Sequence, residues 1–312
     1  MICQHQIRIN NPNYGKIVGE EPYIFVPCGK CFVCKYNDSL AWKTRLLEEN
    51  RVAFNSFFIT LTYAPDKRPS KSVALYNGQS MVYNPVSKKD CQNFIKRFRA
   101  NCERKYNFDL STYKYFLVSE YTPTHLFPHY HAIFFNIGGV SPRSYKTILK
   151  LREAIRESWS NGNITCDVCE DACISYVCKY LTMFQELPDY FAKPFRLMSR
   201  RPAIGISYFD REQLINWHKD NLALYVPRGT FKDKMPRYYK EHIFDEDEKK
   251  RIREKLLALP PYYLRDVDKI GIALDYLKDV DDLDTAMLEL QRYRYKKFED
   301  DMRKKYFKSR KI

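Results

Sequence analysis

Runs of β-branched and aromatic residues predict the strands of this chain. Residues 57–63 read Phe-Phe-Ile-Thr-Leu-Thr-Tyr and stop at Ala64-Pro65, the pattern of a buried strand. Residues 113–121 and 130–136 are two similar runs, separated by the proline-bounded loop 122–128. Because short connections join antiparallel neighbours, these two runs predict a hairpin. A short edge strand is expected near residues 164–168.

Apolar residues at helical spacing predict four helices around these strands. The first covers residues 38–50, and another covers about 172–184. Ser87 followed by Asp90 forms a capping box at the start of an amphipathic helix over residues 88–105. Ser141-Pro142 predicts the start of a helix that ends before residues 161–163, Asn-Gly-Asn.

The remaining segments are predicted to be loops or C-terminal helices. Residues 66–86 have the composition of a polar loop, and residues 188–237 that of loops and short elements. Asp245 with Glu248 caps a helix that Pro260-Pro261 interrupts, and a highly charged helix is expected from about residue 283 to the end. We therefore predict a cysteine-containing segment and helix (1–50), a core (51–210) and a mostly helical extension (211–312).

The composition favours an anionic partner. The chain has 53 Lys+Arg against 38 Asp+Glu, a formal charge of +15. It also has 25 Tyr and 20 Phe, which can stack on unpaired bases, although most are expected to pack the core. The outer face of the helix predicted over 88–105 carries Lys96, Arg97 and Arg99, which we expect to contact DNA. No GxxxxGK[ST] or GxGxxG motif supports nucleotide-driven or dinucleotide chemistry.

Two histidines on one predicted strand form a candidate metal site. His129 and His131 point to the same face because side chains alternate along a strand. Glu120, near the end of the neighbouring strand, is the expected third ligand, and His125 in the connecting loop is its rival. Mixed imidazole and carboxylate ligands suit Mn²⁺ or Mg²⁺.

Two tyrosines complete a possible reaction centre. Tyr176 and Tyr180 lie four residues apart on a predicted helix and therefore project from one face. Packing would explain such a pair in a tyrosine-rich chain, but a metal beside it would activate a phosphate for attack by a phenol. Attack on a DNA phosphodiester exchanges one ester for another, so no ATP is required.

Three ordered motifs resemble those of the HUH-endonuclease superfamily: residues 58–63, residues 128–135 and residues 176–180. More narrowly, the chain resembles the replication initiators of small single-stranded DNA phages of the microvirus group, especially the gokushovirus type. Further likenesses are residues 27–34, Met198 to Gly205 and residues 236–239, so the resemblance covers roughly residues 1–240.

The resemblance implies an α+β fold in which an antiparallel sheet of about five strands is flanked by helices, with a helical C-terminal extension. It implies His129 and His131 as metal ligands, Tyr176 and Tyr180 as nucleophiles and Lys179 as a partner of the phosphate or leaving group. Glu120 carries over as the third ligand less directly, because that ligand varies within the superfamily.

Two groups of cysteines are treated separately. Cys28, Cys31 and Cys34, with Cys3 as a fourth, have the spacing of a structural zinc site, and unligated thiols are the alternative. Cysteines before the tyrosines have no counterpart in the family and are expected to be plain thiols: Cys166, Cys169, Cys173 and Cys178.

The function predicted from all these features is DNA nicking and joining at a viral origin, single-stranded or hairpin, through a 5′-phosphotyrosine. Host helicase and polymerase would be partners. The alternatives are an HUH transposase or plasmid mobilisation nickase, or a zinc-stabilised single-stranded-DNA-binding protein without catalysis. The N-terminus lacks the apolar region of a signal peptide and no apolar run could span a bilayer, so we expect the host bacterial cytoplasm and no membrane partner.

Overall fold

The computed structural model describes the chain except residues 1, 2, 4, 13, 17–20, 75–77, 123, 183–186, 258–295, 298, 299, 302, 303 and 305–312. The chain divides into two compact units. One contains residues 38–217 and 224–240, and the other contains residues 1–37, 218–223 and 241–312. The first of these holds the central sheet.

Five strands form the central sheet, and every neighbouring pair is antiparallel. The strands lie in the order β8-β3-β7-β6-β9. Their bounds are β3 (Ser56–Tyr63), β6 (Lys114–Tyr121), β7 (Pro128–Phe135), β8 (Gly162–Val168) and β9 (Arg196–Met198). The structure confirms the predicted α+β fold with a five-stranded antiparallel sheet, including the β6–β7 hairpin and the edge strand β8.

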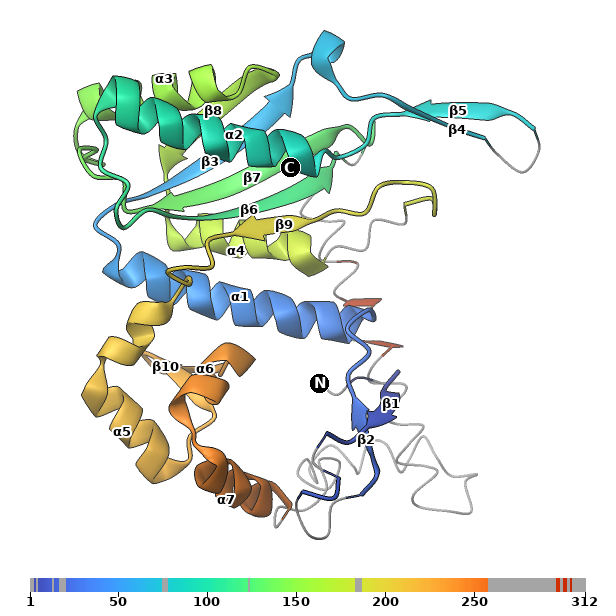
Figure 1. The fold of residues 1–312 in the computed structure, drawn as a ribbon, viewed down its shortest axis with the longest axis vertical. Coiled ribbons are helices and arrows are strands. Elements are labelled where there is room, and N and C mark those ends of the chain that lie inside the picture. The colour runs from blue at the N-terminus through green and yellow to red at the C-terminus, as the bar shows by residue number, and fades with distance from the viewer. Residues whose placement is uncertain are drawn as a thin grey trace. The chain divides into compact units, whose positions relative to one another are not determined.

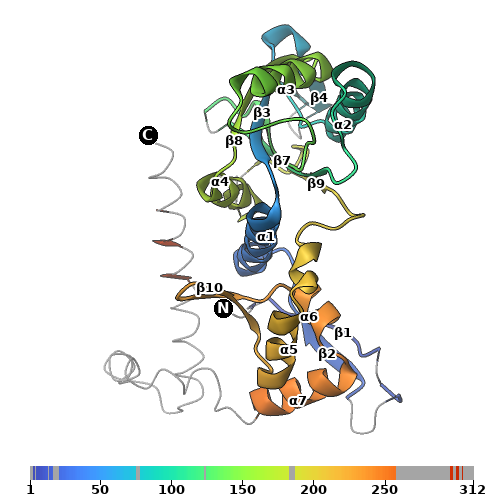
Figure 2. The same cartoon turned by 90° about the vertical axis from the view of Figure 1, so that its left-hand side faces the viewer.

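Helices cover both faces of this sheet (Figures 1 and 2). On one face lie α2 (Lys88–Asn101) and α3 (Tyr145–Ser158), and on the other lie α1 (Phe32–Val52) and α4 (Asp171–Thr182). The predicted cap of α2 is confirmed, because the Ser87 hydroxyl accepts a hydrogen bond from the backbone N–H of Asp90 at 3.2 Å. The sheet therefore separates two chemically independent surfaces.

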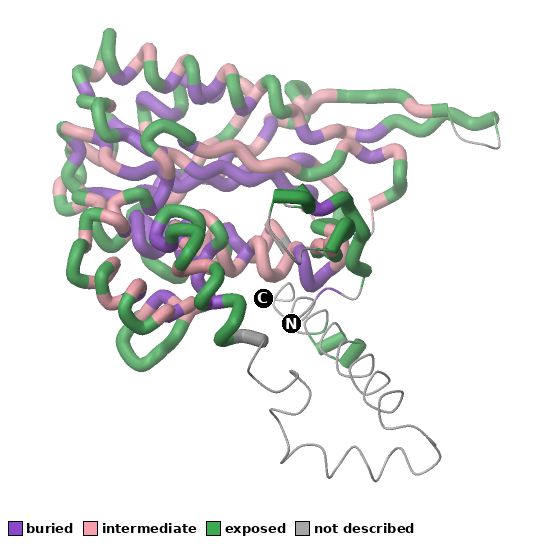
Figure 3. The backbone as a smooth tube through the Cα atoms, turned by 60° about the horizontal axis from the view of Figure 1, so that its bottom comes forward, coloured by how far each residue is buried: buried purple, intermediate pink, exposed green. Residues whose placement is uncertain are grey.

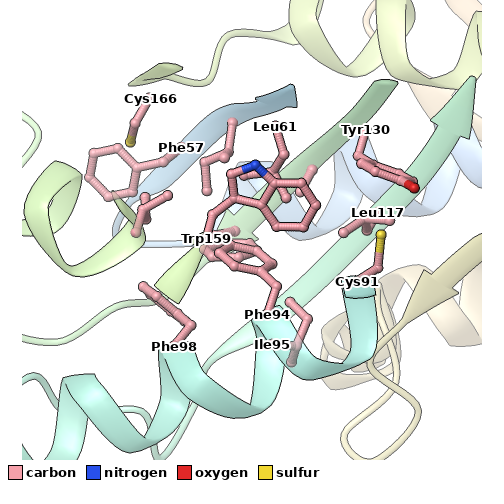
Figure 4. Packing of buried hydrophobic residues seen from close by; sticks show 14 of the residues in the cluster. Phe57, Leu61, Cys91, Phe94, Ile95, Phe98, Leu117, Tyr130, Trp159 and Cys166 are labelled. Atoms are coloured by element: carbon pink, nitrogen blue, oxygen red, sulfur yellow. The ribbon is translucent and has the colours of Figure 1, made fainter. Parts of the chain in front are cut away.

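The period-two pattern of β3 decides which side chains enter each core. Phe57, Ile59 and Leu61 are fully buried toward α2 and α3. Trp159 lies at the centre of this cluster, beside Phe94 of α2 (Figure 4). Figure 3 shows the resulting buried run along the central strands, while the outer sides of the helices are exposed.

A second cluster fills the opposite face. Leu46 and Leu47 of α1 and Val177 of α4 pack there against Phe116 of β6 and Ile133 of β7. Alternate residues of the same strands thus supply two cores, one on each face. The polar residues that interrupt the second core on β3, β6 and β7 are the ones that form the candidate site.

Several predicted boundaries differ from the structure. Helix α1 starts at Phe32 rather than at residue 38, and α3 starts at Tyr145 with Ser144 as its cap rather than at Ser141-Pro142. The segment predicted as a polar loop contains the hairpin of β4 (Lys71–Ala74) and β5 (Ser80–Tyr83), which extends away from the sheet (Figure 1). Gly78, with a φ of +80°, lies in the connection between these strands.

The segment after residue 188 has more regular structure than predicted. It contains β9, the helix α5 (Glu212–Asn221) and a hairpin of β10 (Tyr225–Arg228) and β11 (Phe231–Lys234). Short helical turns occur at η1 (Pro65–Lys67), η2 (Cys102–Tyr106) and η3 (Ile206–Asp210). Two further helices, α6 (Arg237–Ile243) and α7 (Glu246–Leu257), follow β11.

The predicted capping box of α7 is present. The backbone N–H of Asp245 donates to Glu248 and that of Glu248 donates to Asp245, each at 2.8 Å. The predicted break at Pro260-Pro261 lies outside the described residues. Of the helix expected from about residue 283, only residues 296, 297, 300, 301 and 304 are described, and these are helical.

The unit that includes the N-terminus begins with a two-stranded ribbon. Strand β1 (Ile7–Asn10) pairs antiparallel with β2 (Tyr23–Val26). All four residues of β1 are exposed, and β2 alternates between exposed and partly buried positions. Cys28, Cys31 and Cys34 follow β2 directly, and Cys34 lies in the first turn of α1.

Candidate metal and tyrosine site

The two histidines of β7 face the same side of the sheet, as the strand pattern predicts. His129 lies opposite Thr62 of β3 and Glu120 of β6, and His131 lies opposite Thr60 of β3. Tyr130, between the two histidines, points to the other face and belongs to the core under α2 and α3. The sheet register therefore brings the three expected ligands to adjacent positions on one face.

Glu120 approaches both imidazole rings. Its Oε1 lies 3.2 Å from Nε2 of His131 and 3.7 Å from Nδ1 of His129. Each of the three residues offers a ligand atom, and these atoms lie within 4.8 Å of one another. Burial alone would raise the pKa of the Glu120 carboxyl, but hydrogen bonds and charge from the two histidines outweigh burial and lower that pKa below its ordinary value. These residues could hold one metal ion.

Two threonines of β3 hold the remaining ring nitrogens. Thr60 Oγ1 lies 3.1 Å from Nδ1 of His131, and Thr62 Oγ1 lies 2.6 Å from Nε2 of His129. Each hydroxyl thus engages the ring nitrogen that points away from Glu120, which fixes the orientation of each imidazole. Sequence reasoning treated β3 only as a buried strand and missed this role, although Thr at alternate positions in an apolar run was a visible signal.

Helix α4 places both tyrosine rings against the histidine face. The ring centroid of His131 lies 5.4 Å from that of Tyr176 and 5.0 Å from that of Tyr180, with the latter pair stacked. The two tyrosine rings meet edge to face at 4.9 Å. Phe58 of β3 contacts both His131 and Tyr176 and closes one side of this group.

The apolar face of α4 explains why its tyrosines point this way. Ile174, Val177 and Cys178 are buried in the core between α4 and the sheet. Residues three and four apart share a helix face, so this anchoring leaves Tyr176 and Tyr180 next to the histidines. Tyr176 remains 43% exposed, which leaves its ring accessible from solvent. Lys179, between the tyrosines in sequence, is partly buried.

The rival ligand His125 does not join the metal group among the residues that the structure describes. It is exposed in the loop between β6 and β7, and its ring stacks on Phe127 at 5.4 Å. The guanidinium of Arg68 lies 3.7 Å from the centre of the Phe127 ring on the same loop.

The predicted DNA-contacting residues lie on α2, across the sheet from the tyrosines (Figures 1 and 2). Lys96 and Arg99 are exposed, whereas Arg97 is partly buried and donates through Nε to the carbonyl oxygen of Ser158 at 2.8 Å. The Arg99 guanidinium lies 5.9 Å from the Tyr115 ring centre. Contact of these residues with DNA stays a prediction.

The four N-terminal cysteines converge in the other unit. The Sγ of Cys3 lies 3.6 Å from that of Cys28 and 3.7 Å from that of Cys31, and the Sγ atoms of Cys28 and Cys34 are 3.9 Å apart. All four sulfurs lie within 4.8 Å of one another. Backbone N–H groups of Cys31 and Lys30 donate to Cys28 and lower the pKa of its thiol to about 6. This group could hold a second metal.

The other cysteines before and within α4 pack as apolar residues. Cys166 belongs to the core under α2 and α3, and Cys169, Cys173 and Cys178 belong to the core on the opposite face. Burial raises the pKa of the Cys166 and Cys178 thiols to about 12. In the described part of the chain these four residues form no metal-binding group, and they leave the geometry of the tyrosines unchanged.

No helix within the described ranges is both long enough and apolar enough to cross a membrane.

Comparisons with known proteins match the part of the chain that carries the site. A family model described as a replication-associated protein of the ORF2 type matches residues 56–185, a range that includes β3, β6, β7 and α4. No solved structure gives a significant match.

Two viral proteins are similar over most of their length. "Replication-associated protein ORF2" of Spiroplasma virus 4 is 26% identical over 282 residues, covering 81% of this chain and 80% of the relative. "Replication-associated protein VP4" of Bdellovibrio phage phiMH2K is 25% identical over 260 residues, covering 78% of each. The chain belongs to the ORF2-type family of replication-associated proteins and is homologous to these microvirus replication proteins.

Proposed function

We propose that this protein is a metal-dependent DNA nicking and joining enzyme that initiates rolling-circle replication of a small single-stranded DNA phage genome. One observation carries the proposal. The metal-binding group of Glu120, His129 and His131 and the tyrosine pair of α4 share one sheet face, with Tyr176 and Tyr180 both in contact with the His131 ring. Binding DNA alone requires neither group, whereas phosphoryl transfer to a phenol uses both.

The donor set fits a hard divalent cation. One carboxylate and two imidazoles leave coordination positions for oxygen atoms of a phosphate, as suits Mg²⁺ or Mn²⁺. When bound, such an ion neutralises the charge that develops on the phosphate oxygens during the reaction. Glu120, His129 and His131 would hold it, and Thr60 and Thr62 would orient the two rings.

The tyrosines supply the nucleophile. In the first transfer, the phenol oxygen of one tyrosine loses its proton and attacks the phosphorus of a DNA phosphodiester. A tyrosine–phosphorus bond forms and the bond from phosphorus to the 3′ oxygen breaks, leaving a 5′-phosphotyrosine and a 3′-hydroxyl after the leaving oxygen takes up a proton. One ester replaces another, so the energy needed for rejoining is retained in the phosphotyrosine. The 3′-hydroxyl is the primer that a polymerase extends.

Lys179 is the proposed partner of the phosphate or the leaving oxygen. It precedes Tyr180 on α4, and its position in the motif corresponds to the lysine of the two-tyrosine family. A positive charge beside the reacting phosphate would stabilise the departing oxygen. Its ammonium group could also provide the proton that this oxygen acquires.

Two tyrosines on one face permit two successive transfers. After one tyrosine has opened the origin and the displaced strand has been copied past it, the second would cut the regenerated origin. The new 3′-hydroxyl would then attack the first phosphotyrosine and close the displaced strand into a circle. Contact of both rings with His131 lets either tyrosine approach the same phosphate.

The partners follow from this role. The substrate would be viral origin DNA, single-stranded or in a hairpin, and the host replicative helicase and polymerase would act on the exposed strand. The proposed place of action is the cytoplasm of the host bacterium. An HUH transposase or mobilisation nickase would use the same chemistry, but the names of both relatives concern replication. A non-catalytic DNA-binding protein is the alternative of a different class.

Substitution of the phenolic oxygens tests the proposal. Purified protein is incubated with Mn²⁺ and single-stranded DNA fragments that tile the phage genome, labelled at the 3′ end so that the fragment joined to tyrosine carries the label. Wild-type protein should give a labelled covalent adduct on a denaturing gel, and mass spectrometry should locate it at Tyr176 or Tyr180. Tyr176→Phe and Tyr180→Phe should each bind DNA normally, and the double variant should form no adduct.

Tyr145→Phe is the matched control, because Tyr145 is an exposed tyrosine on α3, a helix of the opposite sheet face. It should form the adduct like the wild type. An adduct that persists in the Tyr176→Phe/Tyr180→Phe variant, or that maps to another residue, would refute the two-tyrosine mechanism. Tight DNA binding without any adduct in the wild-type protein would favour the non-catalytic alternative.

A further inference from the structure

Four cysteine sulfurs gather outside the nicking site, in the unit that includes the N-terminus. They come from Cys3, from the loop after β2 and from the first turn of α1. We propose that Cys3, Cys28, Cys31 and Cys34 bind one structural Zn²⁺ ion that fastens the N-terminal ribbon to the start of α1. This inference is independent of the proposed nicking activity, because it uses none of the same residues.

The sulfur separations match one tetrahedral ion. Ligands at the Zn–S distance of about 2.3 Å occupy corners of a tetrahedron whose edges are about 3.8 Å long. The three shortest observed separations, for the Cys3–Cys28, Cys3–Cys31 and Cys28–Cys34 pairs, are 3.6, 3.7 and 3.9 Å. Four side chains from three separate stretches of backbone thus converge at the spacing that a common ion sets.

Backbone N–H groups also point at the sulfurs. Cys31 and Lys30 donate to the sulfur of Cys28 at 3.3 and 3.5 Å, and Cys28 donates to the sulfur of Cys3 at 3.4 Å. Gly29, with a φ of +70°, makes the tight turn between the first two cysteines of the loop. This local geometry stabilises charge on sulfur, as metal-bound thiolates require.

A disulfide, an iron–sulfur cluster or a harder metal ion would fit the four sulfurs less well. A disulfide joins sulfurs about 2.05 Å apart, and all four thiols here are free. In an iron–sulfur cluster, the iron and sulfide atoms lie between the cysteine sulfurs and hold them further apart than one ion does. Magnesium and manganese prefer oxygen ligands, so an all-sulfur set selects zinc, which also binds more tightly than Fe²⁺ or Co²⁺ to a given site.

The ribbon of β1 and β2 explains what such an ion would stabilise. An isolated two-stranded ribbon is at best marginally stable, and every residue of β1 is exposed. Cys3 lies four residues before β1 begins, and Cys28 lies two residues after β2 ends. A shared ion at these positions would join the open end of the ribbon, while Cys34 would attach it to α1. Metal binding would then contribute directly to folding of this segment.

Metal analysis of the full-length protein tests the site. Protein purified in reducing buffer and dialysed should contain one zinc per chain by mass spectrometry. Cys28→Ser/Cys31→Ser should lose this zinc, whereas Cys173→Ser, which removes a partly buried thiol of α4, should keep it. His129→Ala/His131→Ala should also keep one zinc. The last variant distinguishes the two sites, because it should lose nicking alone.

Two further readouts do not depend on a folded cysteine variant. Cobalt bound to zinc-depleted wild-type protein should show the visible absorption bands of a tetrahedral thiolate site. Limited proteolysis of the metal-depleted protein should cleave within residues 5–27 at least tenfold faster than in the zinc-loaded protein. Absence of zinc from reduced, folded wild-type protein would overturn the proposal. Zinc that is lost from His129→Ala/His131→Ala but retained by Cys28→Ser/Cys31→Ser would do the same.

Discussion

Thr60 shows how a residue that touches no substrate can control the proposed metal site. Its Oγ1 lies 3.1 Å from Nδ1 of His131, while Nε2 of the same ring faces Glu120. When the hydroxyl accepts a hydrogen bond from Nδ1–H, the lone pair of Nε2 is directed at the metal position. The tautomer and the ring angle of His131 therefore depend on β3.

Thr60→Val, which keeps the shape of the side chain and removes the hydroxyl, should raise the Mn²⁺ concentration for half-maximal nicking by about 10- to 100-fold. The nicking rate at saturating Mn²⁺ should stay near that of the wild type, because the ligands themselves are intact. Thr60→Ser keeps the hydroxyl and serves as the control. A metal titration of Thr60→Val that coincides with the wild-type curve would show that this hydrogen bond does not tune the site.

At the residue scale, spacing predicted more of the site than chain position did. His129 and His131 were predictable from the two-residue period of a strand, and Tyr176 and Tyr180 from the four-residue spacing of a helix. The choice of Glu120 over His125 was not settled by the sequence, because both are close to β7 along the chain. Strand register decides it, since Glu120 pairs directly with His129.

A buried ion pair links α1 and β6 at the scale of elements. Nζ of Lys114 lies 2.8 Å from both carboxylate oxygens of Glu49, and the N–H of Gly205 donates to the same carboxylate at 2.7 Å. Both charged side chains are buried. Removal of one partner would leave an uncompensated charge in the interior, which is the costly case for a buried pair.

Lys114→Met should therefore lower the free energy of unfolding by about 3–5 kcal/mol. Lys114→Met/Glu49→Gln, which removes both charges, should be less destabilised than Lys114→Met, and urea unfolding of the complete cycle measures the coupling. The pair Lys105–Glu157 at the surface is the control, and Lys105→Met should change the unfolding curve little because solvent screens this pair. Equal losses of stability for the two lysine variants would contradict this account.

Local signals predicted elements well where they were read, and the main omission had a local signal too. The cap of α2 and the capping box of α7 follow from side-chain chemistry within four residues. The hairpin of β4 and β5 was missed although Asn77-Gly78 is a strong hairpin signal, because the flanking residues are short and polar. Helix α5 was missed because its ten residues carry few apolar positions at regular spacing.

At the scale of the sheet-containing unit, the sequence could not say which helix covers which face. Both α2 and α4 are amphipathic, and either could have packed over the histidines. Pairing of β3, β6 and β7 decides the question, because it determines which alternate residues form an apolar surface and which form the polar site. These are long-range pairings, which local pattern does not encode.

This arrangement changes the expected role of the basic residues of α2. They lie across the sheet from Tyr176 and Tyr180, so DNA that contacts them would be held away from the reacting phosphate (Figure 2). Arg97 is less available than Lys96 and Arg99, because its Nε bonds the Ser158 carbonyl. We therefore expect Lys96 and Arg99 to contribute to affinity and to leave the chemical step unchanged.

Lys96→Glu/Arg99→Glu should weaken binding of single-stranded DNA and reduce the salt dependence of log K by about 0.7 for each phosphate that the protein no longer neutralises. The nicking rate at saturating DNA should match that of the wild type. Lys146→Glu/Lys150→Glu makes the same charge change on exposed residues of α3 and separates a local contact from a general effect of net charge. Fluorescence anisotropy at several salt concentrations measures affinity, and single-turnover cleavage measures the rate. If affinity and salt slope are unchanged in Lys96→Glu/Arg99→Glu, α2 does not face the DNA. If the saturated rate falls instead, the bound strand must pass around the sheet edge to reach the tyrosines.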